Sequence, residues 1–136
     1  MIKKALRAVP RFELKLKLLE GNFTIHRFEP GAEIPAEVYS SEFFNISKTD
    51  EELSIVCPGL LVLNSEHYDK DWACIKVLPP LDLSLTGILA ELSGVLAEAQ
   101  ISIFAISTYD TDYIMVKANK VNEAITSLKA AGYKFM

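Results

Sequence analysis

Two short segments in the second half of the chain carry side chains that could hold a small charged molecule. The first, Leu81–Gly87, includes Asp82, Ser84 and Thr86 and precedes an apolar stretch with helical periodicity. Free backbone N–H groups at a helix N-terminus, together with the positive end of the helix dipole, favour a bound carboxylate. Asp82 could pair with an ammonium group. The same N–H groups need no ligand if the hydroxyl of Ser84 or Thr86 simply caps the helix.

The second segment places Asp110 and Asp112 on either side of Thr111 in a predicted turn. A carboxylate there could hold a cationic group through a charge-assisted hydrogen bond, worth roughly 1.5–3 kcal/mol when partly buried. Aspartate in a turn commonly bonds its own backbone instead, and we favour that interpretation for Asp110. For Asp112, which stands at the entrance of a predicted strand, the two interpretations are evenly balanced.

Residues suited to catalysis or metal binding do not gather into a recognisable motif. His26 and His67 are isolated, and the chain has no glycine-rich phosphate loop of the standard types. Cys57 and Cys74 lie in apolar stretches, which is typical of buried, reduced thiols. We therefore expect a protein that is not an enzyme and that uses neither a metal nor another cofactor.

Hydrophobic periodicity predicts the elements that position the two segments. Trp72–Leu78 is a short apolar run ended by Pro79-Pro80, and it predicts a strand. The apolar residues that follow recur at helical spacing and predict an amphipathic helix with this inner face: Ile88, Leu89, Leu92, Val95, Leu96 and Ala99. Gly94 inside that helix costs about 1 kcal/mol relative to Ala, which suggests close packing against a neighbour.

A hairpin and a second helix are predicted next. Ile101–Ser107 and Tyr113–Lys117 are extended apolar runs joined by turn residues. Asn119 is expected to cap the second helix, and Gly132 to end it in a left-handed conformation. Tyr133–Met136 closes as a last short strand. The order strand, helix, strand, strand, helix, strand is that of a ferredoxin-like module, an antiparallel sheet with helices on one face.

The first half shows a weaker version of this order. Phe12–Leu19 and Phe23–Phe28 predict two strands around Glu20-Gly21-Asn22, a plausible hairpin turn. Ala36–Tyr39 leaves room for one turn of helix. Two further strands, Phe43–Ser47 and Leu53–Cys57, flank a charged segment that includes Glu51 and Glu52 and reads as a solvated hairpin tip.

These elements predict an α+β fold of two ferredoxin-like (βαββαβ) modules. The first, residues 1–70, is degenerate, and the second is residues 71–136. A module of about 65 residues buries little surface by itself, so we expect the two to pack together.

Composition predicts a cytoplasmic protein. Half of the 136 residues are hydrophobic and 24% are charged, as in soluble globular proteins. No apolar run is long enough to span a membrane, and the N-terminus lacks the apolar stretch of a signal peptide. We therefore expect no membrane partner.

Positive charge gathers near the N-terminus of a chain whose net charge is −4, at Lys3, Lys4, Arg7, Arg11, Lys15 and Lys17. Clustered lysine and arginine could form a nucleic-acid arm. We favour a solvated arm followed by one strand face, because Glu13, Lys15 and Lys17 alternate with leucines. No nucleic-acid partner is expected.

The second half resembles an ACT domain. The resemblance rests on ISTYDTDYIMV and on the preceding WACIKVLPPLDLSLTGILAELSGVLAEAQISIFA, that is, the loop Leu81–Gly87, the helix after it and the segment Ile106–Val116. It covers residues 72–136 and is similar to the tandem type of aspartate kinases and CASTOR-like arginine sensors. In the first half, FFNISKTDEELSIVCP resembles the N-terminal partner module of such proteins more loosely.

ACT modules bind amino acids or similar metabolites where two modules pack side by side. The resemblance therefore implies an amino-acid sensor that forms a homodimer or a higher homo-oligomer. On one module it implies contacts at Leu81, Asp82, Leu83, Ser84, Gly87 and Ile88. On the partner module it implies contacts at Ile106, Ser107, Thr111 and Asp112.

ACT modules usually regulate an attached catalytic domain, and these residues contain none. The resemblance then implies action on a regulated protein partner or through the protein's own oligomer. The alternative is a protein-interaction adaptor on the same scaffold that binds no metabolite.

Overall fold

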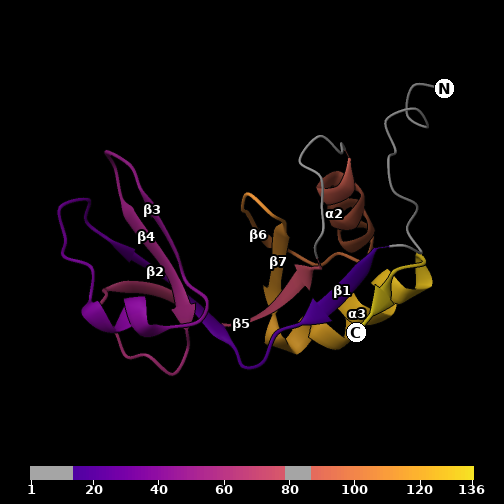
Figure 1. Cartoon of the computed structure of the whole chain (residues 1–136), viewed down its shortest axis with the longest axis horizontal. Helices are drawn as coiled ribbons and strands as arrows, with labels where there is room; N and C mark the ends of the chain where they lie inside the picture. The colour runs from indigo at the N-terminus through magenta and orange to yellow at the C-terminus, as the bar shows by residue number, and fades with distance from the viewer. Residues whose placement is uncertain (1–13, 79–86) are drawn as a thin grey trace. The chain divides into compact units, whose positions relative to one another are not determined.

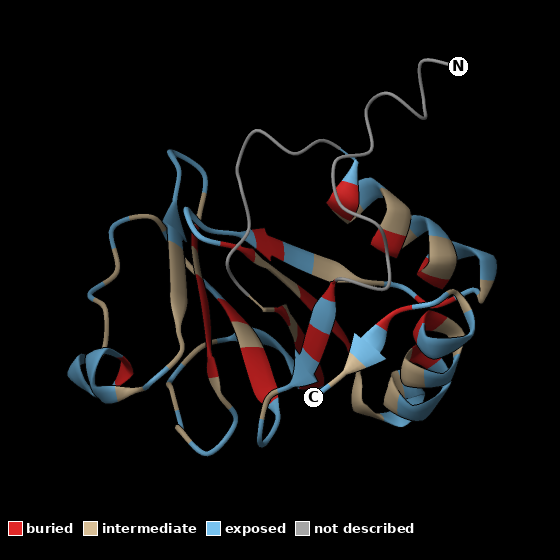
Figure 2. Cartoon of the chain, turned by 45° about the vertical axis from the view of Figure 1, so that its right-hand side comes forward, coloured by how far each residue is buried: buried red, intermediate tan, exposed pale blue. Residues whose placement is uncertain are grey.

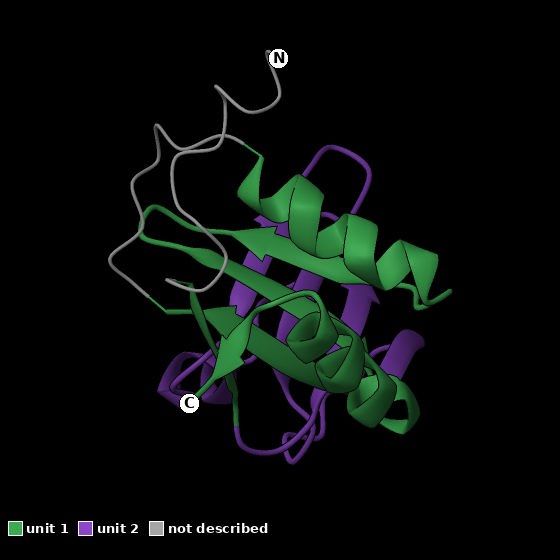
Figure 3. Ribbon diagram, turned by 90° about the vertical axis from the view of Figure 1, so that its right-hand side faces the viewer, with its two compact units in different colours: residues 1–19, 73–136 green, residues 20–72 purple. Residues whose placement is uncertain are grey.

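The computed structural model describes residues 14–78 and 87–136 (Figure 1). The chain forms two compact units (Figure 3). Unit 1 joins the N-terminal segment through Leu19 to Ala73–Met136, and unit 2 is Glu20–Trp72. The long strand β5 (His67–Val77) contributes its first part to unit 2 and its second part to unit 1.

The described residues of unit 1 form a sheet with two α-helices. Along the chain, β5 is followed by α2 (Ile88–Glu98), β6 (Phe104–Ser107), β7 (Asp112–Lys117), α3 (Val121–Ala130) and β8 (Lys134–Phe135). This is the predicted order of a ferredoxin-like module. In space the strands run β6–β7–β5–β1–β8, where β1 is Lys15–Leu18. The α+β class is confirmed, although β8 pairs with β1 in parallel while the other registered pairs are antiparallel.

One face of the unit 1 sheet packs against both helices. Side chains of the strands and helices pack together in one buried cluster. The strands contribute Leu16, Ile75, Val77, Ile114 and Val116, and the helices contribute Leu92 and Leu96 of α2 and Ala124 and Leu128 of α3. Burial of one such large aliphatic side chain contributes about 1.5–3 kcal/mol. Side chains alternate along each strand, so their neighbours point to the opposite face. The alternation appears as bands of buried and exposed residues (Figure 2).

Both helices of unit 1 end in a left-handed residue. Gln100 (φ 61°) follows α2, and the Ile101 N–H donates to the Leu96 carbonyl at 2.9 Å. Gly132 (φ 105°) follows α3, and the Tyr133 N–H donates to the Leu128 carbonyl at 3.1 Å. These are Schellman-type ends, which satisfy carbonyls that the helix leaves unpaired. The role expected of Gly132 is confirmed, whereas Gln100 takes the same conformation without the freedom of glycine.

Unit 2 repeats the ferredoxin-like strand order with fewer helices. Its strands run β3 (Asn45–Lys48), β4 (Leu53–Pro58), β2 (Phe23–Phe28), β5. A 3₁₀ turn, η2 (Ala36–Ser40), stands where the first helix would be. A loop over residues 59–66 replaces the second helix. The core of unit 2 contains Val38, Leu53, Ile55 and Cys57, with Leu61 and Leu63 of that loop packed against it.

The expected hairpin between the first two strands was wrong. β1 pairs with the second part of β5 and with β8, whereas β2 pairs with β4 and with the first part of β5. Residues 20–22, with Gly21 at φ 76°, therefore carry the chain from unit 1 into unit 2. The units consequently do not coincide with a division into residues 1–70 and 71–136, because β1 belongs to the sheet of unit 1.

Two expectations about the helices were also wrong. Added at Gly94, a Cβ atom would have nothing within 4 Å, so this glycine makes no close approach. Asn119 does not cap α3, because it lies inside a 3₁₀ turn, η3 (Ala118–Lys120), that runs directly into the helix. The Val121 N–H donates to the Ala118 carbonyl, which is the 3₁₀ way of satisfying a helix start.

A β-bulge lies near the junction of the two units. Phe23 pairs with Trp72 and Ile25 pairs with Asp69, so Lys70 and Asp71 together face Thr24. Asp71 takes the left-handed conformation (φ 67°) that occurs in one common class of bulge.

Among the described residues, no helix has the length and hydropathy that a membrane span requires.

Candidate functional site

The β6–β7 hairpin places Ser107 directly opposite Asp112. The Ser107 hydroxyl donates to Asp112 Oδ1 at 2.5 Å, the short distance of a charge-assisted hydrogen bond. Two residues further along the register, Ala105 pairs with Ile114, and Ile114 is buried beneath the helices. Opposed residues share a face and successive pairs two residues apart share it too. Ser107 and Asp112 therefore lie on the helix-covered face, at its open end.

The turn between these strands is held by two threonines. The Thr108 N–H donates to the Thr111 carbonyl at 2.8 Å, and the Thr108 hydroxyl donates to the same carbonyl at 3.0 Å. Tyr109 and Asp110 are exposed at the tip. Sequence reasoning noted the turn but missed the part played by Thr108. A threonine at each end of the four-residue turn is the signal that could have identified it.

Thr111 joins the hairpin to the end of β5. Its side chain is buried, and its hydroxyl donates a hydrogen bond to the carbonyl of Val77. Val77 is the last residue of β5. Thr111 therefore fixes the β6–β7 hairpin beside the C-terminal end of β5.

The start of α2 lies at the same end of unit 1 as the hairpin (Figures 1 and 3). Gly87 precedes the helix in the left-handed region (φ 83°), and no side chain makes a capping hydrogen bond there. The Gly87 carbonyl accepts the first helical bond, from the Glu91 N–H at 2.8 Å. By helix geometry, the N–H groups of the first turn before Glu91 have no partner within the helix. A helix start of this kind, beside a carboxylate, can take both ends of a zwitterion.

The predicted site residues are brought together only in part. Leu81, Asp82, Leu83 and Ser84 lie outside the described residues, as does the proposed capping by Ser84 or Thr86. Gly87, Ser107, Thr111 and Asp112 lie at one end of unit 1. The side chain of Ile88 is buried in the core, which leaves its backbone N–H. Ile106 pairs with Tyr113, so its side chain points to the opposite sheet face from Ser107.

Other reactive side chains are poorly placed for catalysis. Burial raises the pKa of the Cys74 thiol to about 12 and also raises the pKa of Cys57, so neither supplies the nucleophilic thiolate at neutral pH. His26 is 4% exposed, and its Nδ1 lies 2.6 Å from the Ser65 hydroxyl. Within residues 14–78 and 87–136, His, Cys, Asp and Glu side chains form no group of three able to hold a metal ion.

Comparisons with known proteins agree with this architecture. The family model of the ACT domain matches residues 67–130, and a model of an N-terminal domain family matches residues 21–60. The solved structure of protein Atu0741 from Agrobacterium tumefaciens is 34% identical, with a TM-score of 0.85 over 94% of each chain. The regulatory subunit of aspartate kinase from Thermus thermophilus shares the fold. Its TM-score is 0.61 at 14% identity, over 85% of this chain and 96% of that one.

A human relative, the protein CASTOR3P, is 32% identical over 88 residues. The match covers 55% of this chain and 54% of the relative. The chain thus spans about half the length of this curated relative.

Proposed function

This chain is a member of the ACT domain family, and from that premise we propose that it is a regulatory protein that senses an amino acid or a related metabolite. Support comes from the aspartate kinase regulatory subunit that shares its fold. ACT modules usually regulate an attached catalytic domain, and residues 1–136 contain none. The sensor would therefore act on a regulated partner or through its own oligomer rather than as an enzyme.

The observation that carries the proposal is the Ser107–Asp112 hydrogen bond at the end of the helix-covered face. Ser107 occupies one oxygen of Asp112, and a carboxylate has further lone pairs for a cationic group. The ammonium group of an amino acid is the natural partner. Its carboxylate would then bind the N–H groups at Gly87 and Ile88, which have no partner within the helix and where the helix dipole favours negative charge.

In the proposed homo-oligomer the ligand lies between modules of neighbouring copies. One side of the proposed site is lined by Leu81, Asp82, Leu83, Ser84, Gly87 and the backbone of Ile88, and the other side by Ser107, Thr111 and Asp112. The strand β6 supports such an assembly, because it pairs only with β7 among the described strands. Residues 101–107 contain neither charge nor proline, the features that normally protect an edge strand from pairing.

Thermal denaturation with each of the twenty amino acids tests the proposal. A ligand present at about 100 times its dissociation constant stabilises the folded state by about 2.7 kcal/mol. We expect one amino acid, or a chemically related group, to raise the melting temperature. If none of the twenty shifts it, amino-acid sensing is wrong.

An adaptor that binds protein without a metabolite is the second candidate. Leu60 and Val62 are 94% and 93% exposed, although Leu61 and Leu63 between and beyond them pack into the unit 2 core. Apolar side chains presented this way mark interaction surfaces. Capture of a partner that ignores added amino acids and is lost in Leu60→Ser/Val62→Ser would favour the adaptor. Tyr109→Ser, at another exposed apolar position, is the matched control.

A further inference from the structure

The face of the unit 1 sheet that points away from the helices carries four neighbouring lysines on β1, β5 and β8, apart from Lys117 on β7. Lys17 of β1 lies directly opposite Lys76 of β5, and Lys15 of β1 lies opposite Lys134 of β8. Lys15, Lys17 and Lys134 are exposed, and Lys76 is half-buried. We call these four residues the lysine face.

The charge of the lysine face is not neutralised by the strands around it. Like charges directly opposite each other on a sheet are destabilising, and here the arrangement occurs twice. Among the described strand residues of unit 1, Asp112 is the one carboxylate, and it lies on the helix-covered face. The Lys76 ammonium lies 5.8 Å from the ring centre of Tyr113. This cation–π contact does not neutralise the charge of the lysine. The face therefore favours an anionic partner.

The chain itself contains a region of opposite charge. Unit 2 has eleven Asp and Glu residues against three Lys and Arg, a net charge of −8. The rest of the chain has eleven Lys and Arg against seven Asp and Glu, a net charge of +4. The overall charge of −4 thus conceals a strong separation between the units.

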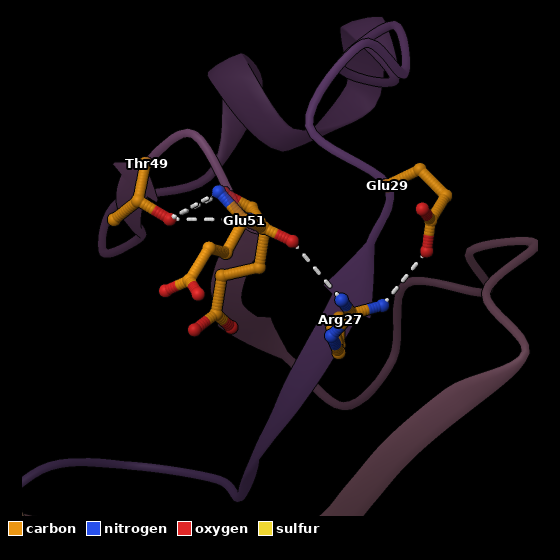
Figure 4. Close-up of polar contacts among 5 residues, drawn as sticks. Arg27, Glu29, Thr49 and Glu51 are labelled. Atoms are coloured by element: carbon orange, nitrogen blue, oxygen red, sulfur yellow. Dashed lines mark hydrogen bonds and ion pairs between the residues drawn. The ribbon is translucent and has the colours of Figure 1, made fainter.

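The most compact acidic feature of unit 2 is the β3–β4 hairpin tip, Asp50–Glu52, which we call the acidic tip. The Thr49 hydroxyl oxygen accepts hydrogen bonds from the N–H groups of Glu51 and Glu52, each at 3.1 Å (Figure 4). From β2, Arg27 donates to the Glu51 carbonyl at 3.1 Å. The backbone of the tip is therefore held in place. Asp50 and Glu51 are exposed, and Lys48 beside them reduces the local charge by one.

Arg27 neutralises the acidic tip only in part, through a Coulombic attraction to Glu52. Its other guanidinium nitrogen, Nη1, pairs with the Glu29 carboxylate at 2.9 Å, while its contact with Glu51 is to the backbone carbonyl (Figure 4). The carboxylates of the tip remain available for an outside cation, and little ordering is needed on binding because the backbone is already fixed.

We propose that the acidic tip of one copy docks on the lysine face of a second copy. Paired positions on neighbouring strands are about 4.5–5.5 Å apart at Cβ, and alternate positions on one strand about 6.6–6.8 Å apart. At these spacings the four ammonium groups of the lysine face lie close enough together to contact the three successive carboxylates of the acidic tip. Nucleic acid fits less well, because its repeated phosphates favour an extended basic track and the net charge of −4 opposes it.

The docking is independent of the proposed metabolite site. Ser107 and Asp112 lie on the helix-covered face, whereas the lysine face is the opposite side of the same sheet. Combined with pairing at β6, the contact would extend a dimer into a higher homo-oligomer.

Charge reversal tests the contact directly. Lys15→Glu/Lys17→Glu gives a chain whose docking surface carries two Lys and two Glu, with no net charge, while its tip stays acidic, and Asp50→Lys/Glu51→Lys gives one in which both are basic. Sedimentation velocity at about 0.01 M salt, where the Debye length is about 30 Å, should show self-association weakened about tenfold or more in each variant. An equimolar mixture should restore association, because the acidic tip of the first variant meets the unaltered lysine face of the second.

Matched reversals elsewhere provide the controls. Lys120→Glu/Lys129→Glu, in η3 and α3, and Glu33→Lys/Glu37→Lys in unit 2 reverse the same number of charges at exposed positions and should leave association unchanged. About 1 M salt, where the Debye length is about 3 Å, should weaken association of the wild-type chain.

Three results would overturn the docking: a monomeric wild-type chain at low salt, association that ignores salt and both reversals, or no restoration in the mixture. A lysine face that binds a short nucleic acid or anionic vesicles without self-association would also overturn it. Thermal shifts with amino acids, measured on the same variants, report on sensing separately. A retained shift without docking would leave the proposed function standing.

Discussion

The hydroxyl of Tyr133, the third residue after α3, donates a hydrogen bond to the carboxylate of Glu91 in the first turn of α2. The bond joins the C-terminal end of one helix to the N-terminal end of the other. It also engages the acidic side chain of the first turn, which would otherwise be free to approach an anion bound at the helix start. The orientation of the α2 N-terminus thus depends on a residue far along the chain.

Replacing Tyr133 by Phe should therefore lower the free energy of unfolding. Tyr133 is 3% exposed, and a hydrogen bond to a charged acceptor contributes about 1.5–3 kcal/mol. Urea denaturation of Tyr133→Phe measures the loss. Tyr109→Phe removes a hydroxyl from a residue that is 83% exposed and should change stability little. Equal stability of the two variants would show that the Glu91 contact contributes nothing.

Asp112→Asn should weaken binding of whichever amino acid raises the melting temperature. The variant keeps the shape of the side chain and removes the charge that would hold an ammonium group. Loss of about 1.5–3 kcal/mol corresponds to a roughly 10- to 150-fold higher dissociation constant, measured by isothermal titration. Asp110→Asn, two residues away at the exposed tip, is the matched control. Equal weakening by both variants would indicate a general charge effect and argue against a contact at Asp112.

The two helix ends predict opposite responses to substitution. Gln100→Gly should raise stability by about 1 kcal/mol, because glycine adopts the observed φ of 61° without a Cβ penalty. Gly132→Ala should lower stability by a similar amount, since alanine is strained at φ 105°. Thermal or urea denaturation of both variants measures the difference. A stabilising Gly132→Ala would contradict the left-handed end of α3.

Stability should fall as the pH is lowered, with His26 as one contributor. Burial lowers the pKa of His26 below its usual 6.5, so the unfolded chain binds the proton more readily than the folded one. The contribution is fully present above pH 6.5 and is lost as the pH falls through the lowered pKa of the folded state. Protonation would place a cation among the rings of Phe28 and Tyr68, each about 6.2 Å away between ring centres.

Urea denaturation at several pH values checks this. His26→Gln should show a shallower loss of stability below pH 6.5 than the wild-type chain, whatever its stability at neutral pH. His67→Gln, at an exposed position, should keep the wild-type slope. Parallel slopes for the wild type and His26→Gln would exclude His26 as the titrating group.

Local patterns predicted most of the elements but not how the first half joins the second. Phe23–Phe28 has its predicted bounds, and the helix starting at Ile88 packs the inner face that periodicity predicted. β5 begins five residues before Trp72, because His67–Asp71 is polar and exposed and gives no apolar signal. The partner of β1 could not be predicted either. The partners of β1 in β5 lie about sixty positions away, so the residues around β1 do not indicate its register.

For the candidate site, residue types were easier to predict than their orientation. The pairing of Ser107 with Asp112 can be deduced once the hairpin is known, because the two residues flank the turn. The side chain of Ile106 was assigned to the same site, yet a period of two places it on the other face. The hydrogen bond from Thr111 to Val77 joins residues 34 positions apart, and only the assembled sheet brings them into contact.

The strand β5 has a consequence for how this protein can be divided. Its first part is the edge partner of β2, and its second part is the central partner of β1 and β7. Truncation anywhere within His67–Val77 would damage both sheets at once, and half-length fragments would expose freshly cut edges prone to aggregate. The two units should therefore be expressed, purified and mutated together as one polypeptide.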